Sequence, residues 1–178
     1  KVNDSTVDSE LDTVTISTLN SAPVANAGAD QSPYVTEVVT LNGGGSTDVD
    51  GDLLTYKWAF TSKPVDSAAT LSEADAKLVN PTFTVDKAGT YVLCLKVNDS
   101  TVDSELDTVT ISTLNSAPVA NAGADQSPYV TEVVTLNGGG STDVDGDLLT
   151  YTWAFTSKAT DSTATLSDAN AVNPTFTV

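Results

Sequence analysis

The sequence repeats itself over a long stretch, and this repeat constrains the fold more than any other feature. Residues 1–56 recur without change as residues 96–151, so the repeating unit is 95 residues long. The match continues from Tyr151 to Val178, except that Lys77 and Leu78 have no counterpart. Six substitutions fall in this part: Lys57 to Thr152, Pro64 to Ala159, Val65 to Thr160, Ala68 to Thr163, Glu73 to Asp168 and Asp75 to Asn170. A fixed period predicts a series of equivalent structural units.

Within one unit, apolar and polar residues alternate over short stretches, which predicts β-strands. In the clearest stretch, Leu53–Thr61, the large residues Leu54, Tyr56, Trp58 and Phe60 share one face. Further strands are predicted at Glu37–Asn42, Thr82–Val85, Thr90–Asn98 and around Val109 and Ile111, with Gly- and Asp-rich turns between them. About seven short strands with one buried Trp predict an all-β fold, an immunoglobulin-like β-sandwich repeated in tandem. We expect Trp58, Tyr91 and Leu93 in its core.

The repeat register divides the chain into three parts. Residues 1–19 are predicted to be the last strand or strands of a preceding repeat, with Val14 and Ile16 facing its core. Residues 20–114 form one complete sandwich, and residues 115–178 form a second repeat that stops before its last two strands. We expect the chain to be a window onto a longer array, with neighbouring repeats joined end to end. A separate subunit that polymerises by strand exchange is the alternative.

Composition excludes several classes of function. The chain has 24 acidic residues against seven lysines and carries a net charge of −17, so it lacks the basic surface that nucleic acids and anionic membranes require. No apolar run is long enough to span a membrane, and membrane insertion is not expected. With no histidine, a Ser or Cys nucleophile has no usual base. The carboxylates cluster in one tight turn instead of flanking a cleft, and we predict that the chain is not an enzyme.

An ordered series of motifs closely resembles the PKD (polycystic kidney disease) domain, and it extends over the whole repeat. The motifs are Ala25–Gln31, Val39–Gly43, Ser46–Asp52, Leu54–Trp58, Ala88–Tyr91 and Leu95–Asp99. The run Gly43-Gly44-Gly45 departs from the family, which more often alternates Gly and Ser. The resemblance implies an extracellular, cell-surface location and a role as a spacer, an adhesion module or an accessory module of a secreted hydrolase, without catalysis of its own.

The turn Asp48-Val49-Asp50-Gly51-Asp52 recurs as residues 143–147 and is the sharpest local feature. Three carboxylates so close together repel one another unless a cation lies among them, and Ca²⁺ binds about six to eight oxygen ligands. The spacing is not that of an EF-hand, because the Gly stands at the fourth position of the turn. An Asp-Gly turn chosen only for its backbone conformation and solubility is the alternative.

The resemblance implies which residues would bind calcium. In calcium-binding PKD domains the ion lies where the linker enters the sandwich. The matching residues of the complete repeat are Asn20, Ser21, Asp48, Asp50 and Asp99. Those of the second repeat are Asn115, Ser116, Asp143 and Asp145, without a fifth ligand.

Together these features predict a non-catalytic structural or adhesive repeat of a long surface adhesin, stalk or filament, stiffened by Ca²⁺ where repeats join. Its partners are expected to be the neighbouring repeats, with surface glycans or proteins as further candidates. An accessory substrate-binding module of a secreted glycan- or protein-degrading enzyme is the alternative function. The single cysteine, Cys94, is expected on the outward face of its strand.

Overall fold

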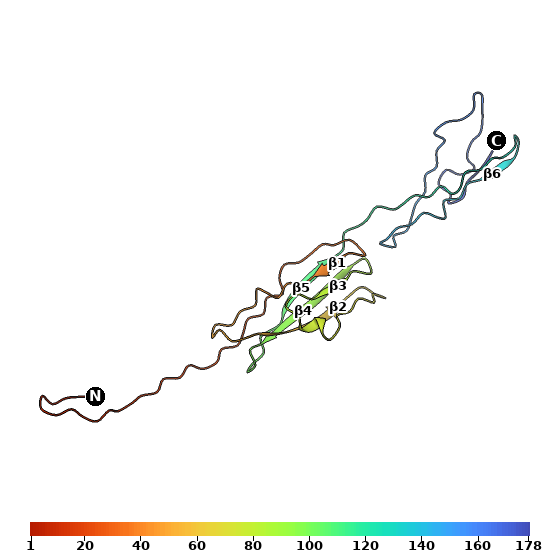
Figure 1. Cartoon of the computed structure of the whole chain (residues 1–178). Helices are drawn as coiled ribbons and strands as arrows, with labels where there is room; N and C mark the ends of the chain where they lie inside the picture. Colours follow the sequence, from red (N-terminus) through yellow and green to blue (C-terminus); the bar gives the residue numbers. More distant parts are fainter.

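The computed structural model describes all residues from 1 to 178. The chain is almost entirely β-structure, and its one helical element is a short 3-10 turn. The molecule is elongated, with the N-terminal segment at one end, the sandwich in the middle and residues 115–178 at the other end (Figure 1). The elements are β1 (Val38–Thr40), β2 (Thr55–Ser62), η1 (Asp75–Lys77), β3 (Thr82–Thr84), β4 (Thr90–Asn98), β5 (Asp107–Ser112), β6 (Val133–Thr135) and β7 (Thr175–Thr177).

The complete repeat is built from two antiparallel sheets. One sheet pairs β1 with β3, so that Val39 lies opposite Phe83. The other sheet has the order β2-β4-β5, with Trp58 opposite Leu95. A bulge between Phe60 and Ser62 ends the regular pairing of β2. The predicted alternation in this strand is confirmed, although the strand begins two residues later than Leu53.

The expectation of seven strands is only partly met, because the first segment of the repeat forms only isolated bridges. Val24 forms an isolated antiparallel bridge with Thr47, and Gln31 forms an isolated parallel bridge with Ile111 of β5. The two bridges have different partners, so the segment builds no continuous ladder with either one. The complete repeat therefore has five strands, and its first segment adds two isolated bridges.

The core of the complete repeat lies between the two sheets. Trp58 is 2% exposed, and its indole N–H donates a 3.2 Å hydrogen bond to the carbonyl of Leu78. Tyr91 and Leu93 are fully buried, so the predicted core positions are confirmed. Burying a large aromatic side chain contributes strongly to stability, and a buried indole needs a partner for its N–H. The buried apolar residues are Ala27, Val39, Leu41, Trp58, Ala69, Phe83, Val85, Tyr91, Leu93, Leu95, Val97, Val109 and Ile111.

The second repeat forms much less regular structure than its sequence suggests. Its one paired sheet is β6 with β7, which are the counterparts of β1 and β3. The alternating stretch 150–157 repeats most of β2 yet forms no strand. In the complete repeat β2 pairs only with β4, and residues 115–178 contain no counterpart of β4. Residues 150–157 therefore lack the partner with which their counterpart β2 pairs.

The strand predicted around Val14 and Ile16 is also absent. Both side chains are exposed, Val14 to 84% and Ile16 to 88%, and residues 9–19 form no ladder. The identical residues Val109 and Ile111 are buried in β5, where β4 pairs with them. A strand depends on a neighbour for its backbone hydrogen bonds, and sequence alternation alone does not supply one.

Candidate metal site

The acidic turn is held in shape by its own first carboxylate. Asp48 Oδ1 accepts hydrogen bonds from the backbone N–H groups of Asp50 at 2.8 Å and of Asp52 at 3.3 Å. Gly51 has a φ of +83°, a left-handed conformation that glycine adopts without steric penalty. The sequence Asp-x-Asp-Gly-Asp therefore folds into a compact turn by local interactions.

The linker that enters the repeat is bound to this turn and to the end of β4. The side-chain amide of Asn20 donates to Asp99 Oδ2 at 2.8 Å. The backbone N–H of Ser21 donates to Asp50 Oδ2 at 2.6 Å. Of the five residues that the resemblance implies for the complete repeat, the structure thus pairs Asn20 with Asp99 and Ser21 with Asp50.

Asp99 is a buried carboxylate at the start of the β4–β5 connection, with only 4% of its surface exposed. Its Oδ1 accepts hydrogen bonds from the backbone N–H groups of Thr101 and Val102, each at 2.7 Å. The hydrogen bond from Asn20, together with these backbone donors, lowers the pKa of Asp99 below its ordinary value. The carboxylate is therefore ionised at neutral pH, and both of its oxygens accept hydrogen bonds from the protein.

One oxygen of the turn has no partner. Asp48 Oδ2 is buried and accepts no hydrogen bond, which is an unfavourable state for a charged oxygen. One carboxylate oxygen from each of Asp48, Asp50 and Asp52 lies within 4.8 Å of the other two. Hard oxygens of this kind are the ligands that Ca²⁺ prefers. The residues present thus fit the ion that the sequence suggested.

Asp52 is a candidate ligand that the sequence analysis missed, and Asp147 is its counterpart in the second repeat. The signal was present in the sequence, because both are the third carboxylate of their acidic turns. The ligand set drawn from the resemblance stopped at the first two.

The second repeat builds the same turn with fewer contacts. Asp145 accepts a hydrogen bond from the Ser116 N–H, and Asp143 Oδ1 accepts one from the N–H of Asp145 at 2.8 Å. The side-chain amide of Asn115 bonds only to the carbonyl of Ser116, since residues 115–178 contain no counterpart of Asp99. Here the buried oxygen without a partner is Asp145 Oδ1.

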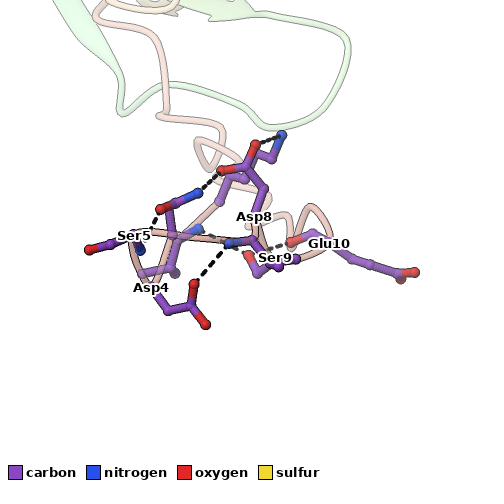
Figure 2. Close-up of polar contacts among 9 residues, drawn as sticks. Asp4, Ser5, Asp8, Ser9 and Glu10 are labelled. Carbon is purple, nitrogen blue, oxygen red and sulfur yellow. Dashed lines mark hydrogen bonds and ion pairs between the residues drawn. The ribbon is translucent and has the colours of Figure 1, made fainter.

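The N-terminal segment contains a copy of the Asp99 turn that folds without a sandwich around it (Figure 2). Asp4 Oδ1 accepts the N–H of Thr6 at 2.9 Å and that of Val7 at 2.8 Å, as Asp99 does with Thr101 and Val102. The Thr6 hydroxyl adds a bond of 2.6 Å, and these bonds lower the pKa of Asp4 to about 2. The turn is therefore a local structure that presents an ionised aspartate.

The fold and the site define a class of protein: immunoglobulin-like sandwich modules with an acidic turn next to the entering linker. Comparison with protein families gives a match to the PKD domain over residues 20–113 and 115–178. The chain belongs to the PKD domain family, as its motifs indicated. PKD domains are typical extracellular modules with structural or adhesive roles, and they are not catalytic.

Two curated relatives share the sequence over most of this chain. The dyslexia-associated protein KIAA0319 of Homo sapiens is 33% identical over 139 residues, and its homolog in Rattus norvegicus is 32% identical over the same length. The match covers 75% of this chain and 12% of each relative, so the chain spans about an eighth of their length.

Among solved structures, the PKD domain from KIAA 1837 protein is 28% identical, with a TM-score of 0.43. That match covers 55% of this chain and 91% of the solved domain. Within the chain itself, no helix has the length and apolar character needed to cross a membrane.

Proposed function

We propose that this chain is a non-catalytic repeat of an extracellular structural or adhesive protein, and that Ca²⁺ stiffens the places where its repeats join. The supporting observation is the contact of the linker residues Asn20 and Ser21 with Asp99 and Asp50. Linker and sandwich meet at a cluster of carboxylates, and one buried oxygen of that cluster has no partner. A cation at this place would restrain the linker relative to the domain.

In the complete repeat the ion would be held by carboxylates of the acidic turn and of Asp99, together with oxygens of Asn20 and Ser21. Bound there, Ca²⁺ supplies positive charge that offsets the repulsion among Asp48, Asp50 and Asp52. The side chains of the protein position the site: Asp48 shapes the turn, Asp50 binds the linker backbone, and Asp99 binds the amide of Asn20. The linker also contains Pro23, whose fixed φ limits its flexibility.

The first experiment measures thermal unfolding of the whole chain with EDTA and with increasing CaCl₂. Extracellular calcium modules bind with Kd values of roughly 10⁻⁴–10⁻³ M, so the Tm should rise over the millimolar range. A ligand at a hundredfold excess over Kd stabilises the folded state by about 2.7 kcal/mol. Asp48→Asn should remove most of this response, because it neutralises the turn carboxylate that carries the unpartnered oxygen.

Asp66→Asn is the matched control, since Asp66 is an exposed loop aspartate with φ of +61°, a conformation that Asn also tolerates. This control should respond to calcium as the unmodified chain does. A Tm that is the same in EDTA and in 10 mM CaCl₂ would refute the calcium part of the proposal. A response that survives Asp48→Asn would place the ion elsewhere.

Stiffening is a separate claim and needs its own measurement. Spin labels on either side of the linker Asn115–Pro118 should report a narrower distance distribution with calcium than with EDTA. The same breadth in both conditions would leave calcium as a stabiliser of the fold alone.

The architecture of the whole protein distinguishes the structural role from that of an accessory module. The structural role predicts many further repeats of the same 95-residue period in the full open reading frame. An adjoining catalytic domain would instead support the accessory module of a secreted enzyme.

A further inference from the structure

The complete repeat has a trough on the outer face of its larger sheet. Its volume is about 1180 Å³. Outward side chains of β2 and β4, among them Lys57, Cys94 and Lys96, form its floor. Residues 73–79 around η1 line one side, and Asp103 and Leu106 of the β4–β5 connection line another.

The trough concentrates the few basic residues of the chain. Three of the seven lysines, Lys57, Lys77 and Lys96, line it. Lys96 forms an ion pair with Asp103 at 3.1 Å, whereas Lys57 and Lys77 form none. With Glu73 and Asp103 as the only acidic lining residues, three positive charges face two negative ones in a chain whose net charge is −17. This local positive surface favours a ligand that carries spaced negative charges.

We infer that the trough binds an acidic polysaccharide, an extended glycan with carboxylate groups. It exceeds the range of about 300–1,000 Å³ that is typical of small-molecule sites, and a segment of a polymer suits it better. The ammonium groups of Lys57 and Lys77 form no ion pair and can bind carboxylates, whereas the side chains of Thr55 and Asn98 already form hydrogen bonds within the domain.

An acidic peptide fits the trough less well, because peptides that bind along sheets use unpaired strand edges. Both edges of β4 are paired, with β2 and with β5. The free edge of β2 lies against η1, and the Trp58 side chain bonds to Leu78 there. The trough therefore offers side chains to a ligand and no row of free backbone groups.

The site belongs to one repeat and not to the other. The second repeat has Thr152 in place of Lys57 and no counterpart of Lys77. Two of the three lysines are thus lost, although the sequence on either side of Lys57 is retained, and residues 115–178 contain no counterpart of Lys96. This inference goes beyond the proposed structural role, since it assigns a ligand class to one repeat of the array.

Cys94 offers a direct test, because it is the only thiol of the chain and lies in the trough. The alkylation rate of Cys94 in the whole chain would be measured at low salt and without calcium, with hyaluronan, with neutral dextran and with single-stranded DNA. We expect hyaluronan to slow the alkylation and the other two polymers to leave it unchanged. Protection should weaken as salt is added, since exposed charges are screened.

The variant Lys57→Thr/Lys77→Gln tests the lysines, and its first change uses the residue of the second repeat. This variant should bind hyaluronan about two- to thirtyfold more weakly, as judged from the concentration that half-protects Cys94, because each exposed charge contact is worth about 0.2–1 kcal/mol. Lys63→Gln/Lys87→Gln is the control with the same change in net charge, and its binding should be unchanged. An unchanged Tm would show that both variants fold.

Three results would overturn the inference: no protection by hyaluronan, equal protection by dextran or DNA, or equal weakening in both double variants. Equal protection by DNA would indicate a general polyanion site. The alkylation experiments are done without calcium. Their failure would therefore not count against the proposed calcium function, which the thermal unfolding experiment tests separately.

Discussion

The amide of Asn20 lies 2.8 Å from the carboxylate of Asp99, although 79 residues separate them in the sequence. This contact joins the linker to the far end of β4, and it is the longest-range hydrogen bond of the candidate metal site. Asp99 is buried whereas Asn20 is exposed, so the bond is only partly shielded from water.

The first prediction concerns this pair. Asn20→Ala should lower the free energy of unfolding by about 0.5–1.5 kcal/mol, the usual net value of one hydrogen bond. A double-mutant cycle with Asp99→Asn, measured by urea unfolding in EDTA, isolates the coupling between the two side chains. In calcium the coupling should change, since both residues are candidate ligands. A coupling near zero in both conditions would mean that the contact contributes no stability.

The second prediction compares the two tryptophans. Trp58→Ala should lower the free energy of unfolding by about 3–5 kcal/mol, because it leaves a cavity among buried side chains. Trp153→Ala is the internal control, since Trp153 occupies the same repeat position but is only half-buried. Its effect should be clearly smaller. Equal losses in denaturant titrations would show that the second repeat packs as tightly as the first.

The third prediction concerns acid. The Ser67 hydroxyl donates to Asp86 Oδ1 at 2.6 Å, and this bond, together with those from the Ala68 N–H and the Tyr91 hydroxyl, lowers the pKa of Asp86 from 3.8 to about 2. A pKa lowered by folding means that the stabilisation is present above pH 4 and is lost as the pH falls towards 2. The stability difference between the unmodified chain and Asp86→Asn should therefore be largest above pH 4 and shrink towards pH 2.

Urea unfolding at a series of pH values measures this difference. Asp66→Asn serves again as the control for the loss of one carboxylate. Part of the acid sensitivity should remain in Asp86→Asn, because folding also lowers the pKa of Asp99. A constant difference from pH 5 to pH 2 would contradict the assignment.

The fourth prediction tests why the second repeat is poor in strands. A chain extended beyond Val178 with the sequence of residues 86–114 supplies a counterpart of β4. Residues 150–157 should then pair with it, and their backbone amides should exchange more slowly with deuterium. An extension with the sequence of residues 96–113 alone lacks most of that strand and should protect them much less. Equal protection by both extensions would show that pairing does not depend on the whole of β4.

Features that depend on residues close together in the sequence were predicted correctly. The alternation in β2 and β4 identified the buried face, because a strand places every second side chain on one side. The Asp turn was also visible, since it forms by local hydrogen bonds, as the isolated Asp4 turn illustrates. The contact between Asn20 and Asp99 came from the family resemblance alone.

What depends on a distant partner could not be predicted in this way. Residues 150–157 and Val14 with Ile16 have the pattern of strands, yet neither forms one without a neighbour. The parallel bridge between Gln31 and Ile111 left no periodic pattern in the sequence. Asp52 was counted among the three carboxylates of the turn but was absent from the ligand set that the resemblance implies.

That parallel bridge has a mechanical consequence. The backbone of Gln31 donates to Thr110 and accepts from Ser112, and Leu114 donates to Pro33, so the first and last segments of the repeat run side by side. Because they run in the same direction, tension on the two ends of a repeat pulls these segments past each other. All three hydrogen bonds are then loaded together in shear and do not open one after another like a zipper. A repeat connected in this way would resist stretching until it yields abruptly, a property suited to a tether under flow.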